Sequence, residues 1–308
     1  MKKKVSVIGA GNVGATTALF IAQSGLANVV LFDVVEGMPQ GKALDMAEAC
    51  PLWNSSSKIT GTNNYSDTAD SDVIVITAGL ARKPGMSRSD LLHANAEIIK
   101  NVCHNIAETS PHSIIIVVTN PMDVMAQLAW KTTEFSCKRV MGMGGILDAS
   151  RLSAFAAWEL NVSPEDIDAF VLGGHGYDMV PLPRFTTVKG IPITEILSRK
   201  KINTLIERTR NGGAEIVSLL KSGSAYYAPA ASTFQMVKSI LLDEKRMLPC
   251  AAYLNGEYGI KDLYMGVPII LGKEGVEKIV EVKLTNEEKI QFRKSCKSVR
   301  KLIKNLGI

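Results

Sequence analysis

The first half of the chain alternates short apolar runs, rich in β-branched residues, with longer stretches in which apolar residues recur at helical spacing. Near-continuous apolar runs are typical of strands buried on both faces, as in a parallel sheet covered by helices. We therefore expect strands at Val5–Ile8, Val29–Phe32, Val73–Thr77 and Ile114–Thr119. The alternation predicts a doubly wound α/β fold.

A helix is expected between the first two runs. Val13, Thr17, Phe20 and Ile21 recur near helical spacing, and Gly25 is well placed to end the helix. A strand–helix–strand unit of about 30 residues is the length expected for a right-handed βαβ crossover. The first 33 residues are therefore predicted to form one such unit.

The pattern changes near residue 145. Met141–Gly145 is rich in glycine, and a helix is expected to begin at Leu147 or Asp148. We therefore predict a first domain over residues 1–145 and a second, α+β domain over residues 146–308. The second domain is expected to bind the substrate.

Four further elements are expected in the second half. Ser163–Asp166 has the capping serine, proline and acids of a helix start. Ala169–Leu172 and Val267–Leu271 look like short strands. Thr285–Glu288 is a capping box before a lysine-rich amphipathic helix, which we expect to pack its apolar stripe on its own domain.

Composition narrows the class of protein. Hydrophobic residues make up 46% and charged residues 21% of the 308 residues, which argues against disorder. The net charge is +5, but no nucleic-acid-binding motif accompanies it, and no apolar run is long enough for a membrane helix. Five scattered cysteines without C-x-x-C spacing argue against a metal site and fit a cytoplasmic protein.

The first predicted turn carries a phosphate-binding motif. The G-x-G-x-x-G pattern directly follows a strand and opens a helix, the context that distinguishes it from ordinary glycine turns. The expected roles are a tight turn at Gly9, close approach of backbone to a pyrophosphate at Gly11, and close helix–strand packing at Gly14. The predicted cofactor-binding residues of this loop are Gly9, Ala10, Gly11, Asn12, Val13 and Gly14.

Asp33, at the end of the second run, identifies the nucleotide. A carboxylate there accepts hydrogen bonds from ribose hydroxyls and repels a 2′-phosphate, which favours NAD over NADP. The alternative is a flexible turn beside a surface acid. Because strand, helix, strand and acid follow in register, we predict a Rossmann-type NAD-binding domain.

A glycine- and proline-containing loop follows the third run. It carries Arg82 and Arg88 at the carboxyl end of a strand, where ligands bind in open α/β sheets. Isolated surface arginines are usually just solvated. Beside a nucleotide site, these two indicate an anionic substrate and a mobile lid.

The second half contains a candidate catalytic group. Asp148 and Arg151 are three residues apart in a predicted helix and so share a face, where they could form a simple ion pair. His175 lies in a Gly-Gly-His-Gly segment, which we expect to leave the imidazole open to a ligand and not buried by its neighbours.

Together these residues resemble the lactate/malate dehydrogenase family, and more specifically its lactate-dehydrogenase-like, malate-oxidising branch. The resemblance runs from Val5 to about Thr285. It is carried by Gly9–Gly14, Asp33, Arg82–Arg88, Val118–Pro121, Asp148–Arg151 and Gly174–Gly176.

The resemblance implies a role for each catalytic and substrate-binding residue. His175 would accept the proton of the substrate hydroxyl and Asp148 would hold its imidazole. Arg151 would bind a substrate carboxylate and Arg88 would polarise the carbonyl group. Asn120 would contact both substrate and nicotinamide.

The family pattern also adds contacts to NAD and an assembly state. Val118 and Thr119 would lie beside the cofactor, and Asn95 would contact it. The resemblance implies a homo-oligomer, with a tetramer favoured over a dimer. The family usually has an acid directly after His-Gly, whereas this chain has Tyr177 first and Asp178 second; the histidine is retained, so we expect catalysis to survive.

Arg82 carries the prediction of the substrate. Lactate dehydrogenases resemble this loop but have glutamine here, and an arginine pairs with the second carboxylate of oxaloacetate. The resemblance therefore implies reversible, NAD-dependent oxidation of (S)-malate to oxaloacetate. The alternatives are a lactate or other 2-hydroxy-acid dehydrogenase, and a non-catalytic NAD-binding sensor.

Overall fold

The computed structural model describes residues 2–80 and 88–308. Arg82 lies outside these residues. Arg88 is described only by its place in the backbone, as the first residue of a helix.

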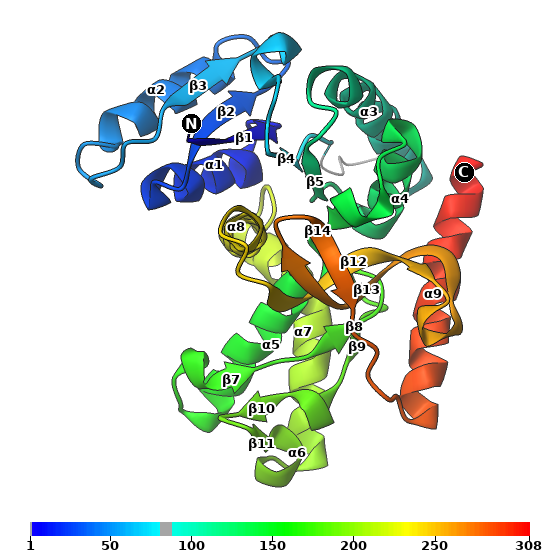
Figure 1. Cartoon of the computed structure of the whole chain (residues 1–308). Helices are drawn as coiled ribbons and strands as arrows, with labels where there is room; N and C mark the ends of the chain where they lie inside the picture. The colour runs from blue at the N-terminus through cyan, green and yellow to red at the C-terminus, as the bar shows by residue number, and fades with distance from the viewer. Residues whose placement is uncertain (1, 81–87) are drawn as a thin grey trace.

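A nine-stranded sheet runs through the centre of the described molecule, in the order β14-β13-β12-β6-β5-β4-β1-β2-β3 (Figure 1). The strands from β1 to β6 are parallel, and β12, β13 and β14 continue the sheet in antiparallel pairing. The bounds are β1 (Lys3–Ile8), β2 (Ala27–Phe32), β3 (Ile59–Thr62), β4 (Val73–Ile76), β5 (Ile114–Val117), β6 (Val140–Gly142), β12 (Arg246–Asn255), β13 (Lys261–Gly272) and β14 (Gly275–Ile279).

The strand order reverses at β1, which pairs with both β2 and β4. Val5 lies opposite Val29 on one side and Val73 on the other. This confirms the predicted doubly wound fold and its four strands. In such a sheet, ligands bind at the carboxyl ends of the strands beside the reversal.

Helices cover the sheet in two groups. In the first group α1 packs against α2 and α8, and α8 against α5, whereas α3, α4 and α9 pack together in the second (Figure 1). As predicted, α1 ends at Gly25, which has the left-handed φ of 71° that favours glycine. The helices are α1 (Asn12–Ser24), α2 (Met38–Ala49), α3 (Arg88–Thr109), α4 (Met122–Thr133), α5 (Gly145–Leu160), α6 (Ile193–Ile196), α7 (Arg199–Leu220), α8 (Tyr227–Leu241) and α9 (Asn286–Leu306).

The second half has a small hydrophobic core of its own between α5 and α7, which includes Leu152, Ile167 and Leu205. Two short sheets lie beside this core (Figure 1). Their strands are β7 (Ile167–Asp168), β8 (Val171–Leu172), β9 (Val180–Pro181), β10 (Thr187–Val188) and β11 (Ile191–Pro192).

The predicted helix start at Ser163 was wrong in extent. Ser163 does cap the backbone N–H of Glu165, but only the single 3-10 turn Pro164–Asp166 follows. The chain then enters β7, because the buried Ile167 pairs with Val188 in a sheet.

Other boundaries also differ from expectation. The helix expected at Leu147 or Asp148 begins at Gly145, and part of the glycine-rich segment is strand β6. The expected strand Ala169–Leu172 is confined to Val171–Leu172. Val267–Leu271 lies within β13, and β12 pairs Ala251 with Gly142, so the central sheet continues past residue 145.

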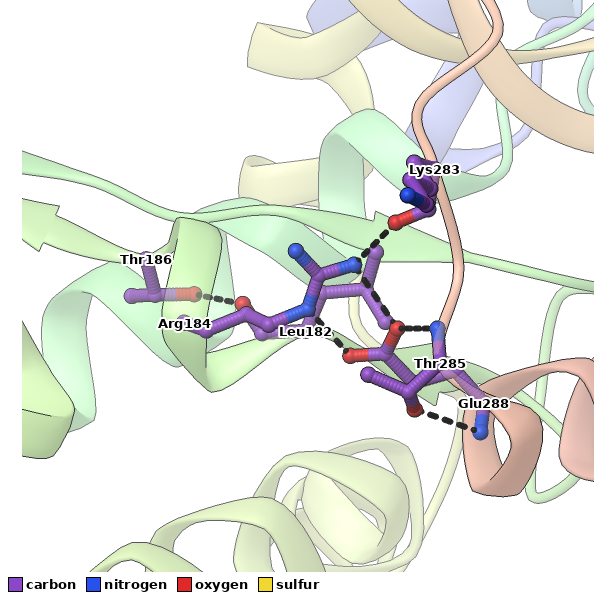
Figure 2. Close-up of polar contacts among 6 residues, drawn as sticks. All are labelled: Leu182, Arg184, Thr186, Lys283, Thr285 and Glu288. Carbon is purple, nitrogen blue, oxygen red and sulfur yellow. Dashed lines mark hydrogen bonds and ion pairs between the residues drawn. The ribbon is translucent and has the colours of Figure 1, made fainter.

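The C-terminal helix is anchored at its first turn. Thr285 and Glu288 form the predicted capping box, and Phe292 is buried on the apolar stripe of α9. Both oxygens of Glu288 also accept from the guanidinium of Arg184, each at 2.8 Å (Figure 2). The capping acid therefore ties α9 to the turn Pro183–Phe185.

Candidate active site

The glycine loop leaves open space in front of the N-terminus of α1. Gly9 has a φ of +107°, and a methyl group there would lie 2.7 Å from the backbone nitrogen of Ala78. A methyl group on Gly14 would collide with the carbonyl of Gly9. A methyl group on Gly11 would meet no atom within 4 Å, and no side chain caps α1. The free N–H groups of the first turn of α1 are therefore suited to bind a phosphate.

Asp33 closes this loop from the end of β2. Its carboxylate accepts from the backbone N–H of Ala10 at 2.6 Å and from that of Val35 at 3.0 Å. A cavity of about 600 Å³ begins here and continues over the largely apolar surface of Phe32 and Ile98. An acid at the mouth of an apolar cavity fits the ribose and adenine of a dinucleotide.

Two further cavities continue from the first along the carboxyl ends of the strands. Thr77, Gly79 and Leu80 line both the first cavity and a second of about 400 Å³. The second shares Val118 and Asn120 with a third of about 360 Å³. The three adjoining cavities run from Asp33 to His175, which suits an extended cofactor with a substrate at one end.

His175 and Asp148 form a hydrogen-bonded pair in the third cavity. Nδ1 of His175 lies 2.9 Å from Oδ2 of Asp148, which is 1% exposed. Burial lowers the pKa of His175, but the adjacent carboxylate outweighs it, so the net pKa is above its usual value. Because Nδ1 is engaged, Nε2 is the nitrogen left for a ligand.

His175 is partly covered by its neighbours but lines the cavity, as expected of an imidazole that is open to a ligand. Its side chain is 13% exposed, with Asp148 against the ring and Asp123 against the backbone N–H.

Arg151 lies on the same face of α5 as Asp148, as predicted. Its Nη1 is 3.7 Å from Oδ1 of Asp148, which is too long for a good hydrogen bond. Its Nε is buried and has no hydrogen-bond partner among the described residues. Burial lowers the pKa of Arg151. A guanidinium with unused donors beside a cavity is suited to bind a carboxylate.

The segment after β5 forms one wall between the second and third cavities. Thr119 donates to the carbonyl of Ala78 at 2.7 Å, which joins the ends of β4 and β5. Asn95 is buried; it accepts from the N–H of Leu80 at 2.7 Å and donates to the carbonyl of Asn120 at 2.8 Å. The structure thus places Asn95 at the cavity wall with its amide engaged by the protein itself.

Two polar residues at this site were missed from the sequence. Asp123, in the first turn of α4, accepts from the backbone N–H of His175 at 2.8 Å. Arg210, in α7, lines the third cavity, and its Nε is buried without a partner among the described residues. An acid among apolar residues at the start of α4 was the available signal for Asp123, whereas Arg210 has several charged neighbours in the sequence.

Tyr177, the unusual residue after His175 and Gly176, contacts α7. Tyr177 is 63% exposed, and its hydroxyl donates to Glu207 of α7 at 3.3 Å. The hydrogen bonds of His175 to Asp148 and Asp123 are therefore formed in the presence of this tyrosine.

Comparison with known proteins agrees with this geometry. Residues 3–142 match the model of the lactate/malate dehydrogenase NAD-binding domain, and residues 146–306 match that of the α/β C-terminal domain of the same family. The chain belongs to the lactate/malate dehydrogenase family. Its first half is therefore an NAD-binding domain.

The similarity extends over the full length of individual relatives. The chain is 54% identical to a malate dehydrogenase of Heliobacterium modesticaldum, over 100% of this chain and 99% of that protein. It is 50% identical to the crystal structure of Salinibacter ruber malate dehydrogenase, with a TM-score of 0.95 and coverage of 99% and 97%. A Cryptosporidium parvum lactate dehydrogenase, solved with lactic acid and nicotinamide adenine dinucleotide, is 39% identical, with a TM-score of 0.97 and coverage of 100% and 98%.

The described residues include neither a metal cluster nor a membrane-spanning helix. Over residues 2–80 and 88–308, no group of three or more His, Cys, Asp and Glu side chains is arranged to hold a metal ion. In the same part of the chain, no helix is both long and apolar enough to cross a membrane.

Proposed function

We propose that this member of the family catalyses the reversible, NAD-dependent oxidation of (S)-malate to oxaloacetate. The observation that carries the proposal is the meeting of the His175–Asp148 pair and the unsatisfied Arg151 in one cavity, which adjoins the cavities that fit NAD. Relatives of similar sequence over their full length are named malate dehydrogenases. Nicotinamide, when bound, supplies the hydride acceptor.

In this proposal, His175 acts as the base. Nε2 accepts the hydroxyl proton of malate while Asp148 holds the Nδ1–H and stabilises the imidazolium that forms. In the reverse direction the imidazolium returns this proton to the oxygen of oxaloacetate. The raised pKa of His175 favours the protonated form that this direction needs.

The arginines and the cofactor loop keep their sequence-derived roles as parts of the proposal. Arg151 holds one substrate carboxylate, Arg82 the second, and Arg88 polarises the carbonyl. Asn120 contacts the substrate and nicotinamide. The cavity wall beside the cofactor is formed by Asn95, Val118 and Thr119. The pyrophosphate and the ribose of NAD are bound by Gly9–Gly14 and Asp33.

Substitution of Arg82 tests the choice of substrate. Arg82→Gln should lower the ratio of kcat/KM for oxaloacetate to that for pyruvate by about 10³, because the guanidinium partner of the second carboxylate is lost. Arg199→Gln, on the exposed start of α7, is the matched control. A ratio that hardly moves refutes the role of Arg82. A wild type that prefers pyruvate indicates a lactate dehydrogenase, and no NADH oxidation with any 2-oxo acid indicates a sensor.

Three broader proposals accompany this function. We propose that residues 1–145 bind NAD and residues 146–308 bind the substrate, since the cavity that joins them takes residues from both. We propose a homo-oligomer, a tetramer in preference to a dimer, which sedimentation equilibrium would test. A cytoplasmic location is supported by five cysteines that are all unpaired, four of them buried.

A further inference from the structure

Asp123 contacts the main chain of the segment that carries His175. Its Oδ2 accepts from the backbone N–H of His175 at 2.8 Å, and the residue itself is 4% exposed. One residue earlier, the N–H of Gly174 donates to Oγ of Ser295 in α9 at 2.9 Å. The backbone before the imidazole is therefore held by two side chains from two different helices.

An ordinary structural role does not account for this carboxylate. Acids are favourable in the first turn of a helix, and a solvated one at the start of α4 would have sufficed. Asp123 is instead buried, and its second oxygen, Oδ1, has no hydrogen-bond partner among the described residues. Burial raises its pKa to about 6, against the opposing effect of the His175 N–H. A buried carboxylate of this kind is costly unless its charge has a use.

The position of Asp123 in the chain links two parts of the site. It is three residues after Asn120, so the segment that forms the cavity wall also carries the acid that holds the histidine backbone. Asp148 fixes one ring nitrogen, while Asp123 fixes the main chain of the same residue. The two carboxylates thus constrain His175 from the ring and from the backbone.

We propose that Asp123 is a positioning residue for His175, and that its negative charge also stabilises the imidazolium. The proposal rests on the proposed function for its effect on turnover, but not for its effect on the histidine itself. The ionisable groups that face Asp123 are His175 and Asp148 of the site and Cys296 of α9; Arg151 also acts on His175. Of these groups, Asp123 and Asp148 stabilise the positive form of the imidazole.

The first test measures the pKa of His175 by NMR titration of the whole protein, with His175→Asn used to assign its signal. Asp123→Asn keeps an acceptor for the backbone N–H but removes the charge, so the pKa of His175 should fall. Burial raises the pKa of Asp123 to about 6, so the carboxylate carries its charge above that pH, where His175, with its raised pKa, titrates. Asp45→Asn, which neutralises an exposed aspartate of α2, should leave the pKa where it is.

The second test measures turnover. Asp123→Ala removes the acceptor and should lower kcat for oxaloacetate reduction by about tenfold, the equivalent of one charge-assisted hydrogen bond. Asp123→Asn should restore most of kcat but move the alkaline limb of the reduction profile to lower pH. KM for oxaloacetate should change less than kcat, because Arg151 is untouched. Ser295→Ala removes the neighbouring bond without a charge and should leave the pH limb in place.

The outcomes separate this proposal from the proposed function. An unchanged pKa of His175 in folded Asp123→Asn refutes the electrostatic part. If kcat falls equally in Asp123→Ala and Asp123→Asn and the pH profile does not change, the positioning part is refuted and Asp123 has only a general role in stability. If wild type does not reduce oxaloacetate but the pKa still falls in Asp123→Asn, the function is wrong and the influence of Asp123 on His175 stands.

Discussion

Gly212 of α7 faces Arg151 of α5 so closely that a methyl group on its α-carbon would stand 3.1 Å from Cδ of the arginine. At the adjacent Gly213 the same methyl group would meet Nη2 at an ordinary 3.7 Å. Each glycine inside a helix costs about 1 kcal/mol relative to alanine. The first of the pair has a reason to be glycine, since it leaves room for the guanidinium that the third cavity presents to a substrate.

Gly212→Ala should therefore weaken substrate binding while the helix itself gains stability. Arg151 must move by a few tenths of an ångström, and we expect a loss of about tenfold in kcat/KM for oxaloacetate, carried mostly by KM. Steady-state kinetics and a thermal melt of each variant measure both effects. Gly213→Ala gains the same helix propensity but should lose less activity. Equal kinetics for the two variants would contradict the role given to Gly212.

The elements that the sequence predicted well are those with local signals. The four apolar runs, the Gly25 helix end and the Thr285–Glu288 capping box each depend on residues close together in the chain, and the structure confirms them. The start at Ser163 also had a correct cap. The predicted helix does not continue after this cap, because Ile167 pairs with Val188 in a sheet, and this tertiary contact overrides the local helix signal.

The site was predictable only where a motif names a residue type at a fixed spacing. The nucleotide loop and Asp33 follow from spacing, and Asp148 and Arg151 share a helix face, as the structure shows. The burial of His175 and its bond to Asp123 depend on packing of segments about 50 residues apart, as the sequence separation of 52 shows. No local pattern contains such a contact.

Removal of the charge of Asp148 should change both the rate and the pH dependence. In the proposed oxidation of malate, His175 acts as a base and must be neutral, so activity should rise as pH increases through its pKa. Asp148 raises that pKa, and Asp148→Asn should therefore move the acid limb to lower pH. Loss of the fixed tautomer should also lower kcat by roughly 10²–10⁴. Profiles of kcat/KM against pH for oxidation and reduction measure this shift, and Asp168→Asn, at an exposed aspartate, is the control. An acid limb that stays in place in Asp148→Asn would contradict the role given to the His175–Asp148 pair.

We predict that the choice of NAD over NADP depends on Asp33. Asp33→Ser removes both the repulsion of a 2′-phosphate and the hydrogen bond to Ala10, so KM for NADH should rise by about tenfold and use of NADPH should increase. Asp33→Asn keeps an acceptor for Ala10 without the charge, which separates the two effects. Steady-state kinetics with both nucleotides test this prediction. If the ratio of kcat/KM for NADPH to kcat/KM for NADH stays at the wild-type value in both variants, the selection depends on other residues.

The ion pair between Glu288 and Arg184 should make the free energy of unfolding depend on pH in the acidic range. The guanidinium of Arg184 lowers the pKa of Glu288 below its usual value, despite partial burial. A group with a lowered pKa in the folded state stabilises the protein above its unfolded pKa, and that stability is lost as pH falls through the folded value. Glu288→Gln should thus reduce the free energy of unfolding by about 1–2 kcal/mol at pH 7, and its difference from wild type should shrink as pH falls below 4.5, the ordinary pKa of a glutamate. Glu287→Gln is the matched control, since Glu287 lies in the same first turn but is exposed. Urea unfolding of the three proteins at pH 4 and pH 7 measures the effect, and equal losses in the two variants at pH 7 would show that the contact with Arg184 adds nothing to the helix dipole.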